Sequence, residues 1–261
     1  MRYFVVDAFA DELFTGNQAG VSLLDAWLDD ETMQNIAAEN NLSETAFLVR
    51  QAPNSAIFDL RWFTPEFEID LCGHATLASA FVVTQFVDST ITEIEFHTMS
   101  GILTVKKCGE LFEMDFPARE PKPIEVTPLM EQALGTLVLE AHLSRDLLLL
   151  LDDEEAVRAL VPNPALIAQL PDCLGVIATA KGNEADFVSR FFVPNAGIFE
   201  DPVTGSTHST LIPFWAKRLG ETEMVARQLS KRGGTLWCEY CADRVKIAGR
   251  AVLYLQGEIF L

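Results

Sequence analysis

The chain has 261 residues, 49% of them hydrophobic, which is enough for one large domain or two mid-sized domains with cores of their own. It carries 19 basic and 38 acidic residues, a formal net charge of −19, and this charge argues against nucleic acid and anionic lipid as partners. The first residues lack the features of a signal peptide, and no apolar run is long enough to span a membrane. The five cysteines, an odd number, do not suit a disulfide framework. We therefore expect a soluble, cytoplasmic protein.

The first part of the chain alternates strand and helix patterns. Residues 3–6 predict an opening strand, and the Gly16-Asn17 pair predicts a tight turn that leads into a second strand or a short helix. From Asp29 onward, an acidic cap and apolar residues at helical spacing predict a helix. A strand follows over residues 42–50. These patterns indicate a mixed α+β fold.

Two distant stretches share one pattern. DLCGHATLASA at 70–80 and EDPVTGSTHST at 200–210 each follow an aromatic strand pattern and open a helix at a glycine. The first of these helices has small and apolar residues on nearly every face, which predicts a helix buried inside its domain.

The elements around the two stretches also repeat. Gly73 precedes Gly101 by 28 positions, as Gly205 precedes Gly233. The repeated order of strand, strand, buried helix and strand predicts an internal duplication of about half the chain. We expect two pseudo-symmetric domains, residues 1–118 and 119–261, joined by a proline-rich linker at 118–128, and the last strand could return to the first domain.

In the second domain, further patterns predict helix starts. A cap residue followed by proline marks Thr127-Pro128 and Asn163-Pro164, and Asp152 with Glu155 forms a capping box. The run Leu147 to Leu151 predicts a core strand. Cys238 and Cys241 lie three apart in a strand pattern and so point to opposite faces, which argues against a metal or redox pair.

The chemistry follows from the two helix starts. A helix N-terminus preceded by glycine offers unpaired N–H groups to a carboxylate or oxyanion, and we expect two such termini to face one cleft. We expect Glu44, His74, Asp201 and Ser206 to lie around these helix starts, where they can move a proton or orient a carboxylate. No phosphate-binding loop, dinucleotide fingerprint or zinc-protease motif is present. We therefore expect proton transfer without a cofactor or metal.

At the level of motifs, the chain resembles the phenazine-biosynthesis PhzF-like isomerases of the diaminopimelate-epimerase-like superfamily. The matching motifs are DAF with FTGNQAGV, NLSETAF at 41–47, DLCGHATLASA and EDPVTGS at 200–206. Gln18 stands where the family's turn usually has proline, and the chain is somewhat short for the family.

The resemblance implies two similar domains, each a curved sheet wrapped around a central helix, with the active site between them. It implies Glu44 as the acid/base that shuttles a proton between carbons, with His74 and Asp201 as its polar partners. It further implies substrate-binding positions, namely Asn17, Ser43, Gly73, Gly205 and Ser206. The founding activity isomerises trans-2,3-dihydro-3-hydroxyanthranilate, and the expected substrate is a small carboxylate. The resemblance also suggests a homodimer.

Amino-acid racemases and epimerases of the same superfamily are the main alternative. They use one cysteine from each domain, and Cys72 is where the first would lie, but no cysteine lies near Gly205. Glu44 has no counterpart either, because Cys173 or Leu174 occupies the corresponding junction. Inversion of a carbon needs a group on each face, whereas a proton shift along one face needs one group, so both differences favour an isomerase. A non-catalytic small-molecule-binding protein with the same fold is a second alternative.

Overall fold

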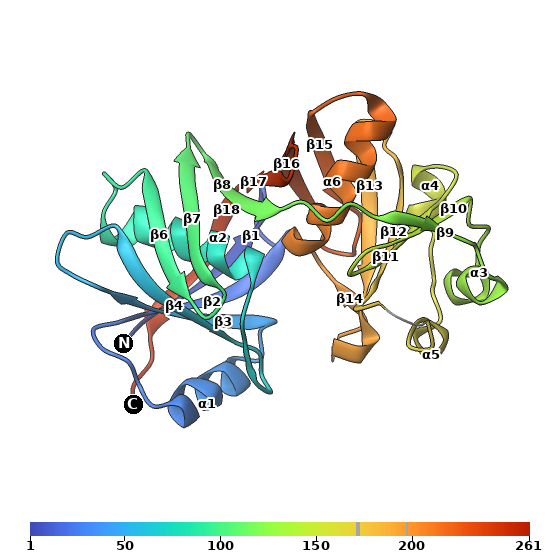
Figure 1. Ribbon diagram of the computed structural model, residues 1–261. Coiled ribbons are helices and arrows are strands. Elements are labelled where there is room, and N and C mark those ends of the chain that lie inside the picture. The colour runs from blue at the N-terminus through green and yellow to red at the C-terminus, as the bar shows by residue number, and fades with distance from the viewer. Residues whose placement is uncertain (171–172, 197) are drawn as a thin grey trace. The chain divides into compact units, whose positions relative to one another are not determined.

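The computed structural model describes residues 1–170, 173–196 and 198–261. The chain divides into two compact units. Unit 1 consists of residues 1–115 and 248–261, and unit 2 consists of residues 116–247. In the ribbon of Figure 1, unit 1 runs from blue to green and ends in red, whereas unit 2 is green to orange-red.

Unit 1 is a curved sheet around one buried helix. Its elements in chain order are β1 (Arg2–Ala8), β2 (Asn17–Leu24), α1 (Asp30–Asn40), β3 (Glu44–Arg50), β4 (Ile57–Phe63), β5 (Glu68–Ile69), α2 (Gly73–Val82), the π-helical turn η1 (Val83–Val87), β6 (Glu93–Thr98), β7 (Gly101–Cys108), β8 (Leu111–Pro117) and β18 (Ala251–Glu258). β1 pairs antiparallel with both β2 and β18, and β2 runs parallel to β3. β4 pairs antiparallel with β3 and β5 and parallel with β6, and β7 joins β6 to β8.

Helix α2 is the core of unit 1, as its composition predicted. It contacts β1, β2, β3 and β18, and the strands curve around it in Figure 1. Eight of its ten residues, including the polar Thr76 and Ser79, are buried. The two hydroxyls donate to carbonyls four residues back, Cys72 O and Ala75 O, so these polar groups are satisfied within the helix.

Helix α1 begins and ends at the capping residues that the sequence predicts. The Asp29 side chain accepts from Thr32 N, and Asn41 ends the helix in the left-handed conformation with φ 50°. Met33, Ile36 and Ala37 pack with Phe47 of β3 and Phe63 of β4. The predicted helix and its stop are therefore confirmed.

Unit 2 repeats the same order of elements. They are β9 (Lys122–Ile124), α3 (Pro128–Leu134), β10 (Glu140–Leu143), β11 (Leu147–Leu150), α4 (Glu154–Arg158), α5 (Pro164–Ile167), β12 (Val176–Lys181), β13 (Phe187–Phe192), the 3-10 turn η2 (Pro194–Ala196), β14 (Glu200–Asp201), α6 (Gly205–Leu219), β15 (Glu223–Gln228), β16 (Gly234–Cys241) and β17 (Arg244–Gly249). β11 runs parallel to β12, β13 pairs antiparallel with β12 and β14, and β13 runs parallel to β15. These relations match those of β2 to β6.

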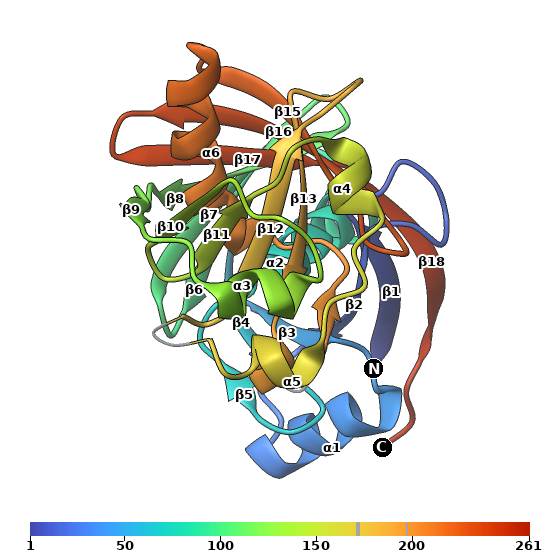
Figure 2. The ribbon, with the colours of Figure 1, turned by 90° about the vertical axis from the view of Figure 1, so that its right-hand side faces the viewer.

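The sheet of unit 2 is buried on both faces. Leu147 and Leu149 of β11 pack in one cluster with residues of α3, α4 and α5, the short helices seen in front of the strands in Figure 2. On β12, Thr179 accepts a hydrogen bond from Trp215 of α6 at 3.0 Å. Because alternate residues of a strand point to opposite faces, the apolar run of β11 is a doubly covered strand, as predicted.

An arginine–glutamate pair occurs at the same position in each unit, as expected for a duplication. Arg61 of β4 donates from Nε and NH2 to both carboxylate oxygens of Glu68, at 2.6 and 2.7 Å. In unit 2, Arg190 of β13 donates in the same way to Glu200, at 2.7 and 2.9 Å. Phe63 pairs with Glu68 and Phe192 with Glu200, so each pair ties the same two strands at the same register.

Two local predictions were wrong. The proline-rich stretch 118–128 contains strand β9, whose Lys122–Ile124 pair with β10, because proline is tolerated on an edge strand. Helix α4 is capped by Asp153, which accepts from Ala156 N at 2.8 Å, and not by Asp152. The caps Thr127 of α3 and Asn163 of α5 are confirmed.

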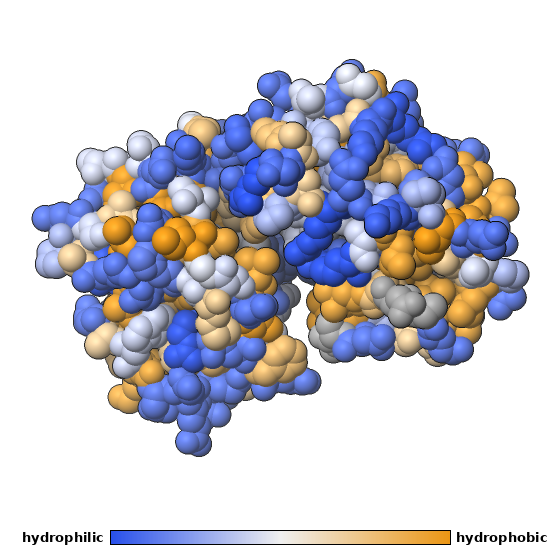
Figure 3. Space-filling model, viewed as in Figure 1, coloured by the Kyte–Doolittle hydropathy of each residue, from blue (hydrophilic) through white to orange (hydrophobic). Residues whose placement is uncertain are grey.

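On the face drawn in Figure 3, hydrophilic side chains are interspersed with apolar ones over both units. Across the residues described, no helix has both the length and the apolar character needed to cross a membrane.

Candidate active site

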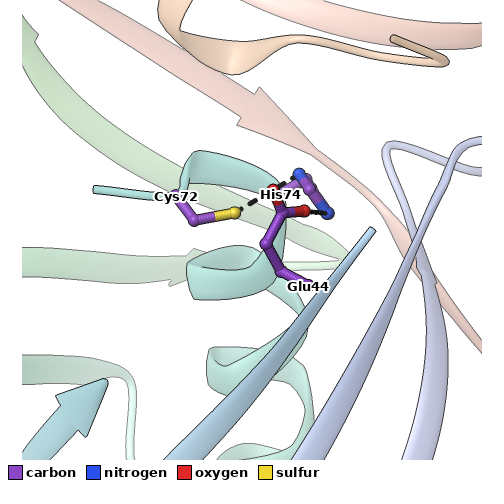
Figure 4. A group of neighbouring side chains, drawn as sticks. All are labelled: Glu44, Cys72 and His74. Atoms are coloured by element: carbon purple, nitrogen blue, oxygen red, sulfur yellow. Dashed lines mark hydrogen bonds and ion pairs between the residues drawn. The ribbon is translucent and has the colours of Figure 1, made fainter. Parts of the chain in front are cut away.

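The side chains of Glu44 and His74 are in contact within unit 1. Glu44 is the first residue of β3 and His74 the second residue of α2. Glu44 Oε2 and His74 Nε2 lie 3.0 Å apart as an ion pair, with side chains 17% and 8% exposed, as Figure 4 shows. Apart from this contact with each other, neither of these two atoms has a hydrogen-bond partner within the described residues. The two buried polar groups therefore depend on each other.

Asn17 and Ser43 extend this pair into a chain of polar contacts. Asn17 Nδ2 lies 3.3 Å from His74 Nδ1, and Ser43 Oγ donates to Asn17 Oδ1 at 3.5 Å. Asn17 is fully buried and its position is fixed as the first residue of β2. Because the Ser43 hydroxyl donates to Asn17 Oδ1, the amide nitrogen of Asn17 faces His74. The unit thus brings together Asn17, Ser43, Glu44, Gly73 and His74.

Cys72 adds a thiol to the same group. Its Sγ lies 3.5 Å from His74 Nδ1, and Figure 4 shows the thiol and the Glu44 carboxylate beside the same imidazole. Burial, followed by the charge of Glu44, raises the pKa of the Cys72 thiol.

The pKa of His74 reflects opposing effects. Burial lowers it, but Cys72 and Glu44 raise it well above its ordinary value. In the neutral imidazole, Nδ1 accepts from Asn17 Nδ2 and the proton resides on Nε2. In the imidazolium, Nε2 also carries a proton. In both states the ring therefore presents an Nε2–H to the Glu44 carboxylate.

The helix that begins at Gly73 is open at its N-terminus. Its cap residue, Cys72, makes no side-chain capping bond, whereas Ser, Thr, Asp or Asn would supply one. The first N–H groups of a helix have no partner within the helix. The start of α2, at Gly73 and His74, can therefore receive a carboxylate or an oxyanion.

Unit 2 has a corresponding open helix start. Thr204, the cap residue of α6, makes no side-chain capping bond; its hydroxyl donates to Asp201 Oδ2 at 2.5 Å and accepts from Gln228 Nε2 at 3.2 Å. Gln228 stabilises this corner, donating to Asp201 O at 2.8 Å and accepting from Thr204 N at 2.9 Å. Asp201, Gly205 and Ser206 lie together here. All three belong to unit 2, whereas Glu44 and its partners belong to unit 1.

Arg145 also lies at this corner, and the sequence analysis did not predict it as a site residue. It lies in the turn between β10 and β11 and donates from NH2 to Ser206 Oγ at 3.1 Å. It also donates from Nε and NH2 to the fully buried Asp146, at 3.1 and 2.6 Å. Burial raises the pKa of Asp146, against the effect of Arg145. A guanidinium beside an open helix start favours an anionic ligand.

The strand registers identify the counterparts of these residues. Phe63 pairs with Thr45 and Phe192 with Val176, so Gly175 matches Glu44, and not Cys173 or Leu174 as expected. Gly20 of β2 pairs with Thr45, and Leu147 of β11 pairs with Val176, so Leu147 is the counterpart of Gly20. Ser144, three positions before Leu147, is therefore the counterpart of Asn17. Arg145, two positions before Leu147, is the counterpart of Gln18. A careful alignment of the repeat would have drawn attention to Arg145 as a charged residue at a turn.

Gly175 also explains why unit 2 lacks a second acid. A Cβ placed there would lie 2.5 Å from Phe191 Cζ and 2.8 Å from the backbone oxygen of Phe192. These contacts are closer than van der Waals packing allows. Any side chain at this position, and a glutamate above all, requires the strand to shift.

The comparison with known proteins agrees with this geometry. Residues 6–257 match the family model described as phenazine biosynthesis-like protein, PhzC-PhzF. The chain belongs to the PhzC-PhzF family.

Its relatives cover it from end to end. An uncharacterized isomerase of Pseudomonas aeruginosa is 49% identical over 261 residues, which are 100% of this chain and 99% of the relative. A solved PhzF-family structure from Enterococcus faecalis is 50% identical, covers 100% of this chain and 99% of its own, and has a TM-score of 0.97. A probable proline racemase of Agrobacterium radiobacter K84 shares the fold, with a TM-score of 0.64, 11% identity and coverage of 100% and 93%. The diaminopimelate-epimerase-like fold of two similar halves, predicted from the sequence, is thereby confirmed.

Proposed function

We propose that the protein is a cofactor-independent isomerase that shifts a proton between carbons of a small, carboxylate-bearing substrate, as in trans-2,3-dihydro-3-hydroxyanthranilate isomerisation. The observation that carries the proposal is the buried pair of Glu44 and His74, whose facing atoms lie 3.0 Å apart and have no other hydrogen-bond partner within the described residues. The names of the related isomerases support the same reaction class.

In the proposed mechanism, Glu44 is the acid/base. Its carboxylate removes a proton from an activated carbon and returns it to another carbon on the same face, so one group serves both steps. His74 presents an Nε2–H to that carboxylate in either protonation state and so fixes its position. Asn17 holds the imidazole from its other side, at 3.3 Å, and Ser43 orients the amide.

Negative charge on the substrate requires donors. We propose that the open helix starts at Gly73 and at Gly205 with Ser206 supply them, because each has N–H groups without a side-chain cap. Asp201 and Arg145 are proposed as the polar groups that orient the substrate in unit 2. Arg145 reaches Ser206 at 3.1 Å, so its charge would strengthen carboxylate binding at this position.

The test is carbon-bound exchange in heavy water. Candidate cyclic and amino-acid carboxylates are incubated with the protein in deuterium oxide, and deuterium incorporation is followed by NMR and mass spectrometry. We expect position-specific incorporation by the wild type and its loss in Glu44→Gln, which keeps the size of the side chain but cannot accept a proton. The matched control is Glu68→Gln, a carboxylate of the same unit that pairs with Arg61 and should retain exchange.

Two outcomes would contradict the proposal. Exchange that persists in Glu44→Gln but disappears in Cys72→Ala would indicate thiol chemistry of the racemase type. Binding of a candidate carboxylate without any deuterium exchange into it would indicate a binding protein.

A further inference from the structure

Cys72 has no role in the proposed proton transfer, yet it lies beside Glu44 and His74, which have such a role. One donor atom each from Glu44, Cys72 and His74 can be chosen so that all three lie within 4.8 Å of one another. Among the residues described, this is the one such group of three His, Cys, Asp or Glu side chains. A thiol, an imidazole and a carboxylate are the ligand types that zinc prefers.

The distance between sulfur and nitrogen fits a shared metal ion. Cys72 Sγ and His74 Nδ1 lie 3.5 Å apart. With Zn–S near 2.3 Å and Zn–N near 2.0–2.1 Å, a tetrahedral angle at the metal puts the two ligand atoms about 3.6 Å apart. The two side chains therefore already stand at the separation that a chelate requires.

The other side of the imidazole completes the arrangement. A metal at Nδ1 would take the lone pair that otherwise accepts from Asn17 Nδ2 at 3.3 Å, while Nε2–H faces Glu44 Oε2 at 3.0 Å, the carboxylate contact that commonly orients a metal-bound histidine. Alternatively, rotation of the Glu44 side chain would give up this contact and bring a carboxylate oxygen to the metal as a third ligand, with water in the fourth position. Glu44 is 17% exposed and gives access to the otherwise buried group, and the net charge of −19 attracts cations.

We propose that Cys72, His74 and Glu44 form a chelating site for a soft divalent cation, zinc above all, and that occupation of this site blocks the acid/base. The thiolate and imidazole ligands select zinc and its neighbours over magnesium and calcium. The metal is an inhibitor here and takes no part in the isomerisation. The binding part of this inference is independent of the proposed function, and the inhibition part rests on it.

Cobalt(II) is the probe for binding, because a thiolate bound to it gives a charge-transfer absorption. We expect the whole protein to take up one cobalt ion with this absorption and to release it when zinc is added. Cys72→Ala should remove the absorption and weaken cobalt binding by more than about 100-fold, beyond the loss caused by an outer-shell partner. Cys108→Ala, which removes an exposed thiol of the same unit, is the matched control and should bind as the wild type does.

The inhibition is tested in the exchange assay. Zinc should suppress exchange by the wild type and by Cys108→Ala, whereas Cys72→Ala should keep its activity in the presence of zinc. Equal zinc inhibition of wild type and Cys72→Ala would overturn the proposal, as would a cobalt spectrum without a thiolate band. If no substrate shows exchange, the proposed function fails, and the cobalt spectra still decide whether the metal site exists.

Discussion

His208 predicts a pH dependence of stability that can be worked out from the structure. The residue lies in α6, is fully buried, and donates from Nδ1 to Thr204 O at 2.8 Å. Its Nε2 has no hydrogen-bond partner within the described residues, so protonation would bury an unpaired charge. Burial lowers the pKa of His208 to about 4, against the opposing effect of the bond to Thr204.

The sign follows from linkage. The unfolded chain takes up a proton on His208 near its ordinary pKa of about 6.5, whereas the folded chain resists protonation down to about 4, so unfolding is favoured as the pH falls through this interval. The full difference is roughly 3 kcal/mol, and about 2 kcal/mol of it is lost by pH 5. Above pH 7 the histidine is neutral in both states and this contribution to the free energy of unfolding is complete.

The perturbation is His208→Asn, which keeps a donor toward Thr204 and removes the titrating group. Urea unfolding between pH 7.5 and 4.5 measures the free energy in both proteins. Loss of the ring lowers the stability of the variant at every pH, but between pH 7.5 and 5 we expect the variant to lose roughly 2 kcal/mol less stability than the wild type. His97→Asn, at a more exposed position of the other unit, is the matched control. Parallel slopes for wild type and His208→Asn would refute the reasoning, as would an NMR titration of folded His208 near pH 6.5.

Three further predictions follow from the site and the sheet. Glu44→Gln should lower the pKa of His74 because the neighbouring charge is lost, and NMR titration of the ring protons would contradict this if the pKa stayed or rose. Arg145→Lys should raise KM about tenfold with little change in kcat, because the charge near Asp146 remains while the hydrogen bond near Ser206 is lost; an unchanged KM would remove Arg145 from substrate binding. Gly175→Ala should reduce the free energy of unfolding by about 1–3 kcal/mol because its Cβ overlaps Phe191 and Phe192, and Gly257→Ala, whose nearest neighbour would be 3.8 Å away, should change it by less than about 0.5 kcal/mol.

The sequence predicted the unit 1 group because local order determines most of it. His74 follows the first glycine of α2, Glu44 begins the strand after a capped helix, and Asn17 follows a turn glycine. Each position is the end of an element, and element ends are readable from caps, glycines and periodicity. The family motifs supplied their roles.

The unit 2 group is less accessible to this reasoning because its contacts are distant in sequence. Arg145 and Ser206 are 61 positions apart and Thr204 and Gln228 are 24 apart, and no local pattern predicts either contact. Asp152 and Asp153 are equally good caps by residue type, and only the position where β11 ends selects Asp153. The proline-rich stretch 118–128 was read as a linker because proline lacks a donor, but an edge strand tolerates that loss.

The pairing of β1 with β18 determines the order in which the chain can assemble as it is synthesised. Every residue from Arg2 to Ala8 faces a partner between Ala251 and Glu258, and the whole of unit 2 lies between them in the sequence. A ribosome adding 5–20 residues per second needs roughly 7–26 s for residues 116–247. During that time one edge of β1 is unpaired and open to wrong partners, while unit 2 can fold to completion. Unit 1, which carries the proposed acid/base Glu44, is therefore the first to begin folding and the last to close.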